Sequence, residues 1–229
     1  MANKGKYYES QFEEATIELL REAHWQYTLG DDIHRKYTDP LIEEDLRNFL
    51  AVQYKDKNLT TSEMDGIVAN LRNTGGQNDY YALRNAFLLY RDGYDFAYSD
   101  SRDNPFRMEY IDFEHPDHNI FRCVNQFVMG QGRENRRPDI LLFINGIPVC
   151  IIELKNPTKQ NATIRDAHTQ ICTRYMRDIP ALLKYCALAV ISDGAKNALG
   201  TTYTPFEFFY EWKKIENEDK AGKGLDTLR

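Results

Sequence analysis

Three charged residues lie at the ends of two apolar runs, where charge is unusual. Asp139 directly precedes the run Ile140–Ile144. Glu153 directly follows the run Val149–Ile152, and Lys155 comes two residues later. Acidic and basic side chains are rarely buried unless they are paired or bind a metal. Two carboxylates suit Mg²⁺, which polarises a phosphate and activates water, and a nearby ammonium group can stabilise the developing charge. The trio therefore predicts a metal-dependent phosphodiesterase site.

The connection between the two runs decides whether the carboxylates meet. Side chains alternate along a strand, and the turn sets the register of a hairpin. A two-residue turn at Asn145–Gly146 would place Asp139 opposite Ile152, on the wrong face, whereas a three-residue connection would place it opposite Glu153. Asp139 could also lie outside the ladder, because it follows Pro138 at the start of the strand. The hypothesis requires Asp139 and Glu153 to converge.

The spacing alone is weak evidence, because Glu-x-Lys with an upstream aspartate is a common pattern. The chain also carries a net charge of −6, and phosphate neutralisation by basic side chains supplies most non-specific affinity for DNA. A nuclease would need a local basic patch or a larger partner that delivers the DNA. Basic residues do flank the trio, and they are Arg133, Arg136, Arg137, Arg165, Arg174 and Arg177.

Composition indicates an ordinary globular protein. With 229 residues, 42% apolar and 28% charged, the chain fits one large domain or two small ones. The polar N-terminus lacks a secretory signal and the apolar runs are too short to span a membrane, so a cytoplasmic protein is expected. The cysteines form no Cys-x-x-Cys pair and the histidines do not cluster at ligand spacing. The segment His115–His118 could bind a metal, although a solvated turn is the commoner role.

The first ninety residues are expected to be mostly helical. Apolar periodicity predicts a helix over about Ser10–Trp25 and a second that begins with Pro40 as its first residue. Thr60 with a glutamate three residues later resembles a capping box for a third helix. A fourth is expected over about Asp79–Arg91.

Strands and helices are expected to alternate in the rest of the chain. A capping box at Thr163 with Asp166 predicts a helix that runs to about Arg177, and Gly194–Gly200 is expected to end a strand and start a helix. Asn156-Pro157 should end the second apolar strand. The other expected strands are Phe106–Phe113, Asn119–Met129, Tyr185–Ser192 and Tyr203–Ile215, the last with a turn or without one. The pattern predicts an α/β fold, with a mixed central sheet flanked by helices and a mainly helical N-terminal third.

One stretch has a specific resemblance. Residues 135–149 and 152–157, Asn-Arg-Arg-Pro-Asp-Ile-Leu-Leu-Phe-Ile-Asn-Gly-Ile-Pro-Val and Ile-Glu-Leu-Lys-Asn-Pro, resemble the N-terminal nuclease domain of the R subunit of type I restriction-modification enzymes. Ile111–Phe113, Val124–Phe127, Thr169–Ile171 and Arg174–Pro180 are also similar to that family. These domains belong to the PD-(D/E)xK superfamily, so the resemblance implies that fold.

The resemblance also implies roles for single residues. Asp139 and Glu153 would bind Mg²⁺ and Lys155 would be the catalytic lysine. An acidic residue on the first helix usually completes the site, and Glu13 fits best because it borders the apolar stripe of that helix. A solvated helix charge is the alternative role for Glu13.

The family carries a Gln-x-x-x-Tyr motif on the helix after the lysine, and the match here is imperfect. Gln170 and Tyr175 are five residues apart, which separates them by about 140° around a regular helix. Arg174 shares a face with Gln170 instead. Either the helix is locally widened, or Tyr175 has a packing role, or Arg174 contacts the phosphate in its place. These three residues and Arg137 are the predicted DNA contacts.

The expected function follows from the family. The chain would be a Mg²⁺-dependent endonuclease domain over residues 1–215, with a helical insertion at about 35–92 and a nuclease core at about 94–192. It would cut double-stranded DNA after ATP-driven translocation by a complex with methyltransferase (M) and specificity (S) subunits. ATP would serve the absent motor domain, to which the charged tail 216–229 leads, because this chain has no P-loop motif. The alternatives are a docking or DNA-guiding module without catalysis and a small autonomous nuclease.

Overall fold

A mixed β-sheet forms the centre of the molecule. The computed structural model describes residues 4–100, 102–130, 135–155, 163–194 and 196–211, and the side chains from residue 10 onward. Within these residues the sheet has seven strands, in the order β1 (Gln26–Leu29), β4 (Phe121–Asn125), β5 (Ile140–Ile144), β6 (Ile147–Leu154), β7 (Leu188–Ser192), β8 (Asn197–Gly200) and β9 (Tyr210–Glu211). β1 is parallel to β4 and β6 is parallel to β7, while the other neighbouring pairs are antiparallel.

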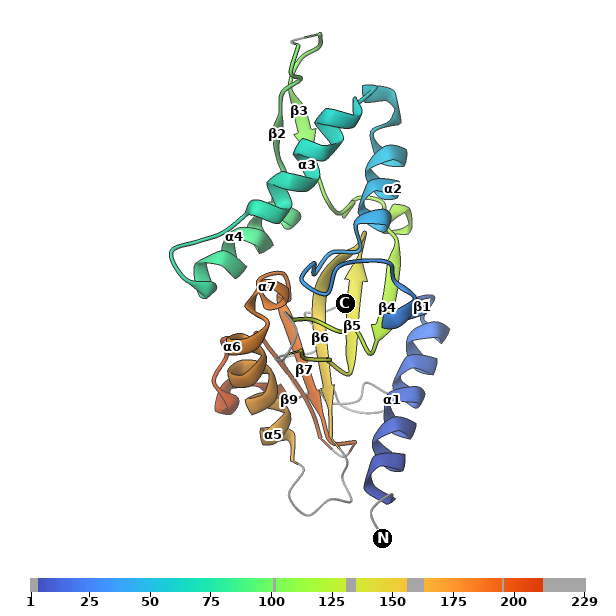
Figure 1. Cartoon of the computed structure of the whole chain (residues 1–229), viewed down its shortest axis with the longest axis vertical. Helices are drawn as coiled ribbons and strands as arrows, with labels where there is room; N and C mark the ends of the chain where they lie inside the picture. Colours follow the sequence, from blue (N-terminus) through green and yellow to red (C-terminus); the bar gives the residue numbers. More distant parts are fainter. Residues whose placement is uncertain (1–3, 101, 131–134, 156–162, 195, 212–229) are drawn as a thin grey trace, which may run out of the picture.

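Helices cover both faces of this sheet and extend beyond one end (Figure 1). α1 lies on one face and the α5–α7 segment, with a π-helix inside it, on the other. α2, α3 and α4 form a helical lobe together with the small hairpin of β2 (Tyr94–Phe96) and β3 (Phe106–Met108). The helices are α1 (Lys4–Glu22), α2 (Glu43–Gln53), α3 (Thr61–Asn73), α4 (Asp79–Asp92), α5 (Ile164–Thr169), the π-helix Gln170–Tyr175, α6 (Met176–Asp178) and α7 (Pro180–Leu183). The predicted α/β class, mixed sheet and helical first third are confirmed.

Strand alternation gives the two faces of the sheet separate cores. On the α1 face, Ile17 packs with Ile140, Ile152 and Leu154. On the opposite face the π-helix contributes Ile171 and Tyr175, and α7 contributes its leucines, to a cluster that contains Leu141, Phe143, Ile151, Ala189 and Ile191. Each fully buried aliphatic side chain contributes roughly 1.5–3 kcal/mol relative to exposure. These two layers fix the orientation of β6, so its alternate residues must point to opposite faces.

The β5–β6 hairpin contains a two-residue turn and a bulge. Asn145 and Gly146 both have positive φ, 50° and 76°, as a type I′ turn requires, and Ile144 pairs with Ile147. The register then shifts by one residue between Leu142 and Phe143, so that Ile140 pairs with Ile152. A β-bulge places two residues of one strand opposite one of the other. The predicted need for a three-residue connection was wrong, because the bulge supplies the extra residue.

The helical lobe is bonded to the turn of this hairpin and to the segment between α7 and β7. The Ile42 N–H donates to the carbonyl oxygen of Gly146 at 2.9 Å, and the Tyr90 hydroxyl donates to the Tyr185 carbonyl at 3.1 Å. The predicted capping box of α3 is present, with Thr60 and Glu63 bonded reciprocally. α2 begins at Glu43 rather than at the predicted Pro40, because the Ile42 N–H is bonded to the hairpin turn instead of within a helix.

Other predicted elements differ from the observed ones in length or type. The strand predicted at Phe106–Phe113 ends at Met108, and residues 109–114 form irregular structure and bends that pair with no strand. The strand predicted at Asn119–Met129 is limited to Phe121–Asn125. The helix predicted to start within Gly194–Gly200 is wrong, since residues 197–200 form β8.

The strand predicted at Tyr185–Ser192 begins only at Leu188. In the last predicted strand, Phe206–Phe208 forms a 3-10 helix and only Tyr210–Glu211 is extended, up to the end of the described residues. Asn156-Pro157 and the tail 216–229 lie outside those residues. The continuous helix from Thr163 to Asp178 and its capping box are confirmed. No described helix is long and apolar enough to cross a membrane.

Candidate functional site

The two predicted metal ligands meet at the end of the hairpin remote from its turn. Because Ile140 pairs with Ile152, extending the ladder by one residue sets Asp139 across from Glu153 on the same face. An oxygen of the Asp139 carboxylate accepts a hydrogen bond from the Leu154 N–H at 2.7 Å. Asp139 is partly buried and the Glu153 side chain has no exposed surface. The structure thus brings together the carboxylates that the motif requires.

Glu153 is held by an ammonium and a hydroxyl group. Lys155 Nζ lies 2.6 Å from one carboxylate oxygen, and the Tyr175 hydroxyl lies 3.2 Å from the other. Burial, reinforced by the charge of Asp139, raises the pKa of Glu153 to about 8, against the opposing effects of Lys155 and Tyr175. In the absence of a cation, the buried carboxylate is therefore costly to ionise at neutral pH.

The five-residue spacing of Gln170 and Tyr175 is accommodated by a π-helix that spans these two residues. The wider turn of a π-helix bonds residue i to i+5 and brings both side chains to one face. Gln170 Nε2 donates to the Tyr175 hydroxyl at 2.7 Å. Burial and the neighbouring Glu153 raise the pKa of Tyr175, so its hydroxyl stays a donor. Of the three alternatives for this motif, a locally widened helix is the one observed.

Glu13 approaches the same end of the sheet from the α1 layer. One of its carboxylate oxygens accepts hydrogen bonds from the side-chain amides of Asn125, at 2.9 Å, and Gln126, at 3.1 Å. Asn125 pairs with Ile140, next to Asp139. Glu13 is partly buried rather than solvated, and its role as a metal ligand stays a prediction.

Asn125 and Gln126 support Glu13 but are not among the predicted site residues. Gln126 has a φ of 57°, which is uncommon for a residue other than glycine and often marks functional positions. Tyr27 also donates from its hydroxyl to the Asn125 side chain at 3.0 Å. The signal available in the sequence was the family-like segment Val124–Phe127, which ends β4 and opens the following loop.

The predicted basic neighbourhood is present in part. Arg137 and Arg174 are exposed, and the Arg137 carbonyl lies 3.5 Å from the Tyr175 hydroxyl. Arg136 and Arg177 both contact Asp178, at 2.7 Å and 2.6 Å, and they lower the pKa of that carboxyl to about 2, Arg177 having the larger effect. Arg165 lies over the ring of Phe206, and Arg133 is outside the described residues.

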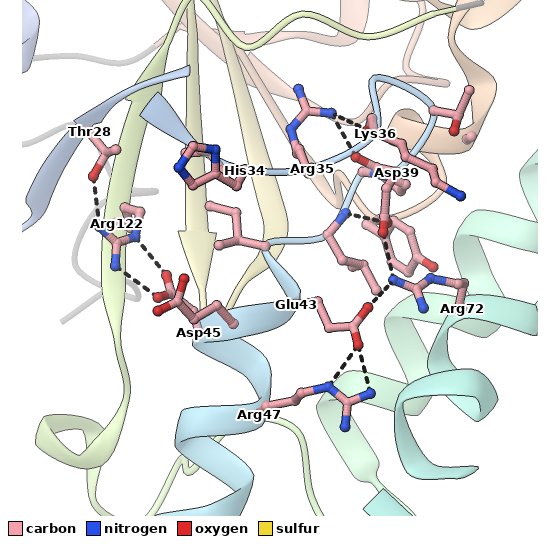
Figure 2. Close-up of a pocket in the computed structure, with 18 of the residues that line it drawn as sticks. Thr28, His34, Arg35, Lys36, Asp39, Glu43, Asp45, Arg47, Arg72 and Arg122 are labelled. Atoms are coloured by element: carbon pink, nitrogen blue, oxygen red, sulfur yellow. Dashed lines mark hydrogen bonds and ion pairs between the residues drawn. The ribbon is translucent and has the colours of Figure 1, made fainter. Parts of the chain in front are cut away.

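A cavity of about 1160 Å³ lies elsewhere, at the junction of the helical lobe and the sheet (Figure 2). Its lining comes mainly from residues 28–48 and 181–185, with Arg72 and Arg122. None of the predicted catalytic or DNA-binding residues lines it. A duplex contacts an open protein surface rather than a deep pocket, so the distance of this cavity from the carboxylates does not conflict with the predicted chemistry.

Charges around the cavity are largely paired with one another. Figure 2 shows Glu43 between Arg47 and Arg72. Arg122 holds Asp45 through two contacts of 2.6 Å and 2.8 Å. These pairs connect α2 to β4 and α3, which indicates a joint between the lobe and the sheet.

Relatives of this chain are described as type I restriction enzyme endonuclease subunits. It is 29% identical, over 94% of its length, to the Type I restriction enzyme HindI endonuclease subunit of Haemophilus influenzae. It is 30% identical, over 90% of its length, to the Putative type I restriction enzyme MjaIXP endonuclease subunit of Methanocaldococcus jannaschii. The chain spans only 21% and 20% of these two relatives.

A family model agrees with these relatives and covers almost all of the described structure. It is described as Type I restriction enzyme R protein N terminus, and it matches residues 6–208. The match includes α1, the β5–β6 hairpin and the π-helix, which together position the carboxylates. The chain therefore belongs to the family of type I restriction enzyme R protein N-terminal domains.

Proposed function

We propose that this chain is the endonuclease domain of a type I restriction enzyme R subunit, with a PD-(D/E)xK site that cuts double-stranded DNA. The observation that carries the proposal is the fully buried Glu153 across from Asp139, with Lys155 Nζ at 2.6 Å. A structural ion pair gains nothing from a second carboxylate beside it. A site that receives a divalent cation does, because the cation offsets both the desolvation and the repulsion.

The donor set fits Mg²⁺. Asp139 and Glu153 offer hard oxygen ligands, and Mg²⁺ is usually held by one or two carboxylates while it keeps several waters. When bound, the ion supplies Lewis-acid polarisation of the phosphate and a nucleophilic water at neutral pH. Glu13, held in place by two amides, is the third candidate ligand.

The remaining residues orient the carboxylates and the substrate. Lys155 places a positive charge where the phosphate oxygens gain charge in the transition state. Tyr175 fixes the rotamer of Glu153, and Gln170 fixes the Tyr175 hydroxyl. The exposed Arg137 and Arg174 are suited to contact the backbone of the DNA.

The complete enzyme would supply what this acidic chain lacks. With a net charge of −6, bulk attraction to DNA is weak. M and S subunits and an ATP-driven motor would hold the duplex, translocate it and deliver it to the site. Cleavage then follows translocation.

The alternative is a docking or DNA-guiding module that keeps the fold without the chemistry. The paired charges at the lobe–sheet joint favour a stable helical lobe able to serve as a docking element. A module without chemistry has no need for a metal, so metal binding separates the two functions.

Cleavage by the complete enzyme tests the proposal. Lys155→Ala should abolish DNA cleavage and leave ATP hydrolysis and translocation intact, because the lysine acts only within the nuclease site. Glu14→Ala is the matched control, since Glu14 is exposed on α1 and should leave all three activities unchanged. Undiminished DNA cleavage by the Lys155 variant would contradict the proposed nuclease site.

A calorimetric titration with Mn²⁺ tests the metal site in this chain. The wild-type chain should bind Mn²⁺, and Asp139→Ala should weaken binding strongly while its thermal unfolding stays cooperative. Equal binding by both proteins, or none by either, would favour the docking module.

A further inference from the structure

A second cluster of metal-ligating side chains lies in the loop that precedes β4. It contains Asp112, His115 and His118, and one ligand atom from each lies within 4.8 Å of the other two. The loop includes a short 3-10 helix, Pro116–His118, with His115 as its N-cap residue. Their rings are stacked, with centroids 4.9 Å apart and an angle of 18° between the planes.

The distances within the cluster, one of them a hydrogen bond between His118 and Asp112, are close to those between the ligands of one metal ion. Asp112 Oδ2 lies 3.0 Å from His118 Nδ1 and 3.6 Å from His115 Nδ1. Ligands at the usual bond lengths of about 2.0–2.2 Å in a tetrahedral zinc site are about 3.3 Å apart. The two measured distances bracket that value. Both imidazoles are more than half exposed, so small side-chain rotations close the remaining gap.

Asp112 is held in place for this role by its own partners. It is buried, with 4% of its surface exposed. Its Oδ1 accepts the backbone N–H groups of Glu114 and His115, at 3.1 Å and 2.8 Å. The Gln53 amide, at the end of α2, donates to Oδ2 at 3.1 Å. A ligand fixed by a surrounding shell of hydrogen bonds needs little reorganisation to bind a metal.

We propose that Asp112, His115 and His118 bind a borderline divalent cation of the Zn²⁺ class at a site separate from the candidate nuclease carboxylates. One carboxylate and two imidazoles match zinc and its neighbours, whereas Mg²⁺ prefers an all-oxygen set. Three protein ligands leave a fourth position, which faces solvent, for water.

The position of the site in the fold indicates what the ion does. The Asn119 side chain bonds the backbone N–H and carbonyl of Asp112 and also the side chain of Asn145 in the hairpin turn. Gln53 connects the same carboxylate to α2. An ion at this point fastens the loop to the helical lobe and to the turn end of the sheet. An ion bound there would stabilise the junction between the two parts, with water at its open position.

Cobalt titration of the 229-residue chain, produced without a histidine tag and in excess Mg²⁺, tests the site. One equivalent of Co²⁺ should bind with the visible absorption of a tetrahedral nitrogen–oxygen site and raise the Tm, and Zn²⁺ should displace it. The double variant His115→Ala, His118→Ala should lose both the absorption and the shift in Tm. His34→Ala, which removes an exposed histidine elsewhere, should retain them.

A control at the carboxylates separates this proposal from the proposed nuclease function. Glu153→Gln should keep the Co²⁺ absorption, because the two sites share no residue. Loss of the absorption in Glu153→Gln, its persistence in the double histidine variant, or a thiolate charge-transfer band from the cysteines would each overturn the proposal. So would the absence of Co²⁺ binding by the wild-type chain.

Discussion

At the scale of the residue, the candidate site depends on one buried carboxylate. Glu153 has no exposed surface and faces Asp139, and its pKa is raised to about 8. Ionising it in the metal-free protein costs free energy that Lys155 offsets only in part. Groups kept in such an environment are typical of functional sites, where stability is given up for chemistry.

Glu153→Gln should stabilise the metal-free chain, and more so at high pH. Between the ordinary pKa of 4.5 and about 8, the folded state holds a proton that the unfolded state has released. The free energy of unfolding therefore falls as pH rises through this window. An amide avoids this loss. We expect a gain on the order of 2 kcal/mol at pH 8.5, or roughly 4–8 °C in Tm, and little gain at pH 4.5.

Thermal unfolding in EDTA at the two pH values measures this effect. Glu14→Gln, which changes an exposed glutamate on α1, should show no pH-dependent difference from wild type. A stability gap between Glu153→Gln and wild type that is the same at both pH values would contradict a raised pKa for Glu153.

Tyr175→Phe should weaken metal binding most at low pH. The Tyr175 hydroxyl bonds the Glu153 carboxylate at 3.2 Å and lowers its pKa. Without this bond, Glu153 should hold its proton more tightly, and a metal must displace that proton. Mn²⁺ affinity should fall several-fold at pH 6.5 and recover towards pH 8.5, as calorimetry would show. The matched control is Tyr210→Phe at an exposed position, and a pH-independent loss in Tyr175→Phe would contradict the argument.

The residues that carry the chemistry were easier to predict than the residues that hold them in position. Asp139, Glu153 and Lys155 could be identified because charge at the ends of apolar runs needs a reason. Asn125 and Gln126 could not, because amides at the end of a strand are common. Their contact with Glu13 joins positions 112 and 113 residues apart in the chain.

At the scale of the element, two local irregularities set the geometry of the site. The bulge in β6 moves the register by one residue, and the π-helix turns Tyr175 towards Glu153. Neither follows from hydrophobic periodicity, because each inserts one residue into a regular pattern. The turn at Asn145–Gly146 and the spacing of Gln170 and Tyr175 showed where the strand register and the helix type were undecided. The packing of side chains on both faces of the sheet determines them.

Deleting Thr173 should convert the π-helix into an α-helix without loss of the site. Thr173 is exposed within that segment, and its removal restores a four-residue spacing between glutamine and tyrosine, which places them on one face of an α-helix. π-helical turns are rare compared with the α-helix, the form that most helical segments adopt. We therefore expect an unchanged or higher Tm and retained Mn²⁺ binding.

Thr173→Ala, which keeps the chain length, is the control for the deletion and should leave the π-helix intact. Circular dichroism and Mn²⁺ calorimetry on the two variants show whether the extra residue of the π-helix is required for metal binding. If the deletion variant folds but no longer binds Mn²⁺, the π-helix itself positions Glu153.

At the scale of the whole molecule, elements set by local sequence signals could be predicted, and elements that depend on tertiary contacts could not. The helical first third was predictable because caps and apolar periodicity are local, as the capping box at Thr60 shows. β1 and β8 have only four residues each, and β8 contains asparagine and glycine. These strands exist because β4 and β7 provide an edge to pair with, which no short window of sequence reveals.

The acidic charge of the whole chain predicts that it cuts DNA poorly by itself. The chain has a net charge of −6, and Arg136 and Arg177 are engaged by Asp178. Among the residues that the structure describes, few cations near the site therefore remain to neutralise phosphates, and this neutralisation dominates non-specific affinity. The isolated chain with Mg²⁺ should therefore leave plasmid DNA largely intact at 150 mM salt, a concentration that suppresses weak electrostatic binding to roughly the extent expected in cells. Lowering the salt should increase any residual cutting, and Lys155→Ala should remove it. Efficient digestion at that salt would mean that the site binds DNA without a partner, and delivery by the complete enzyme would then be unnecessary.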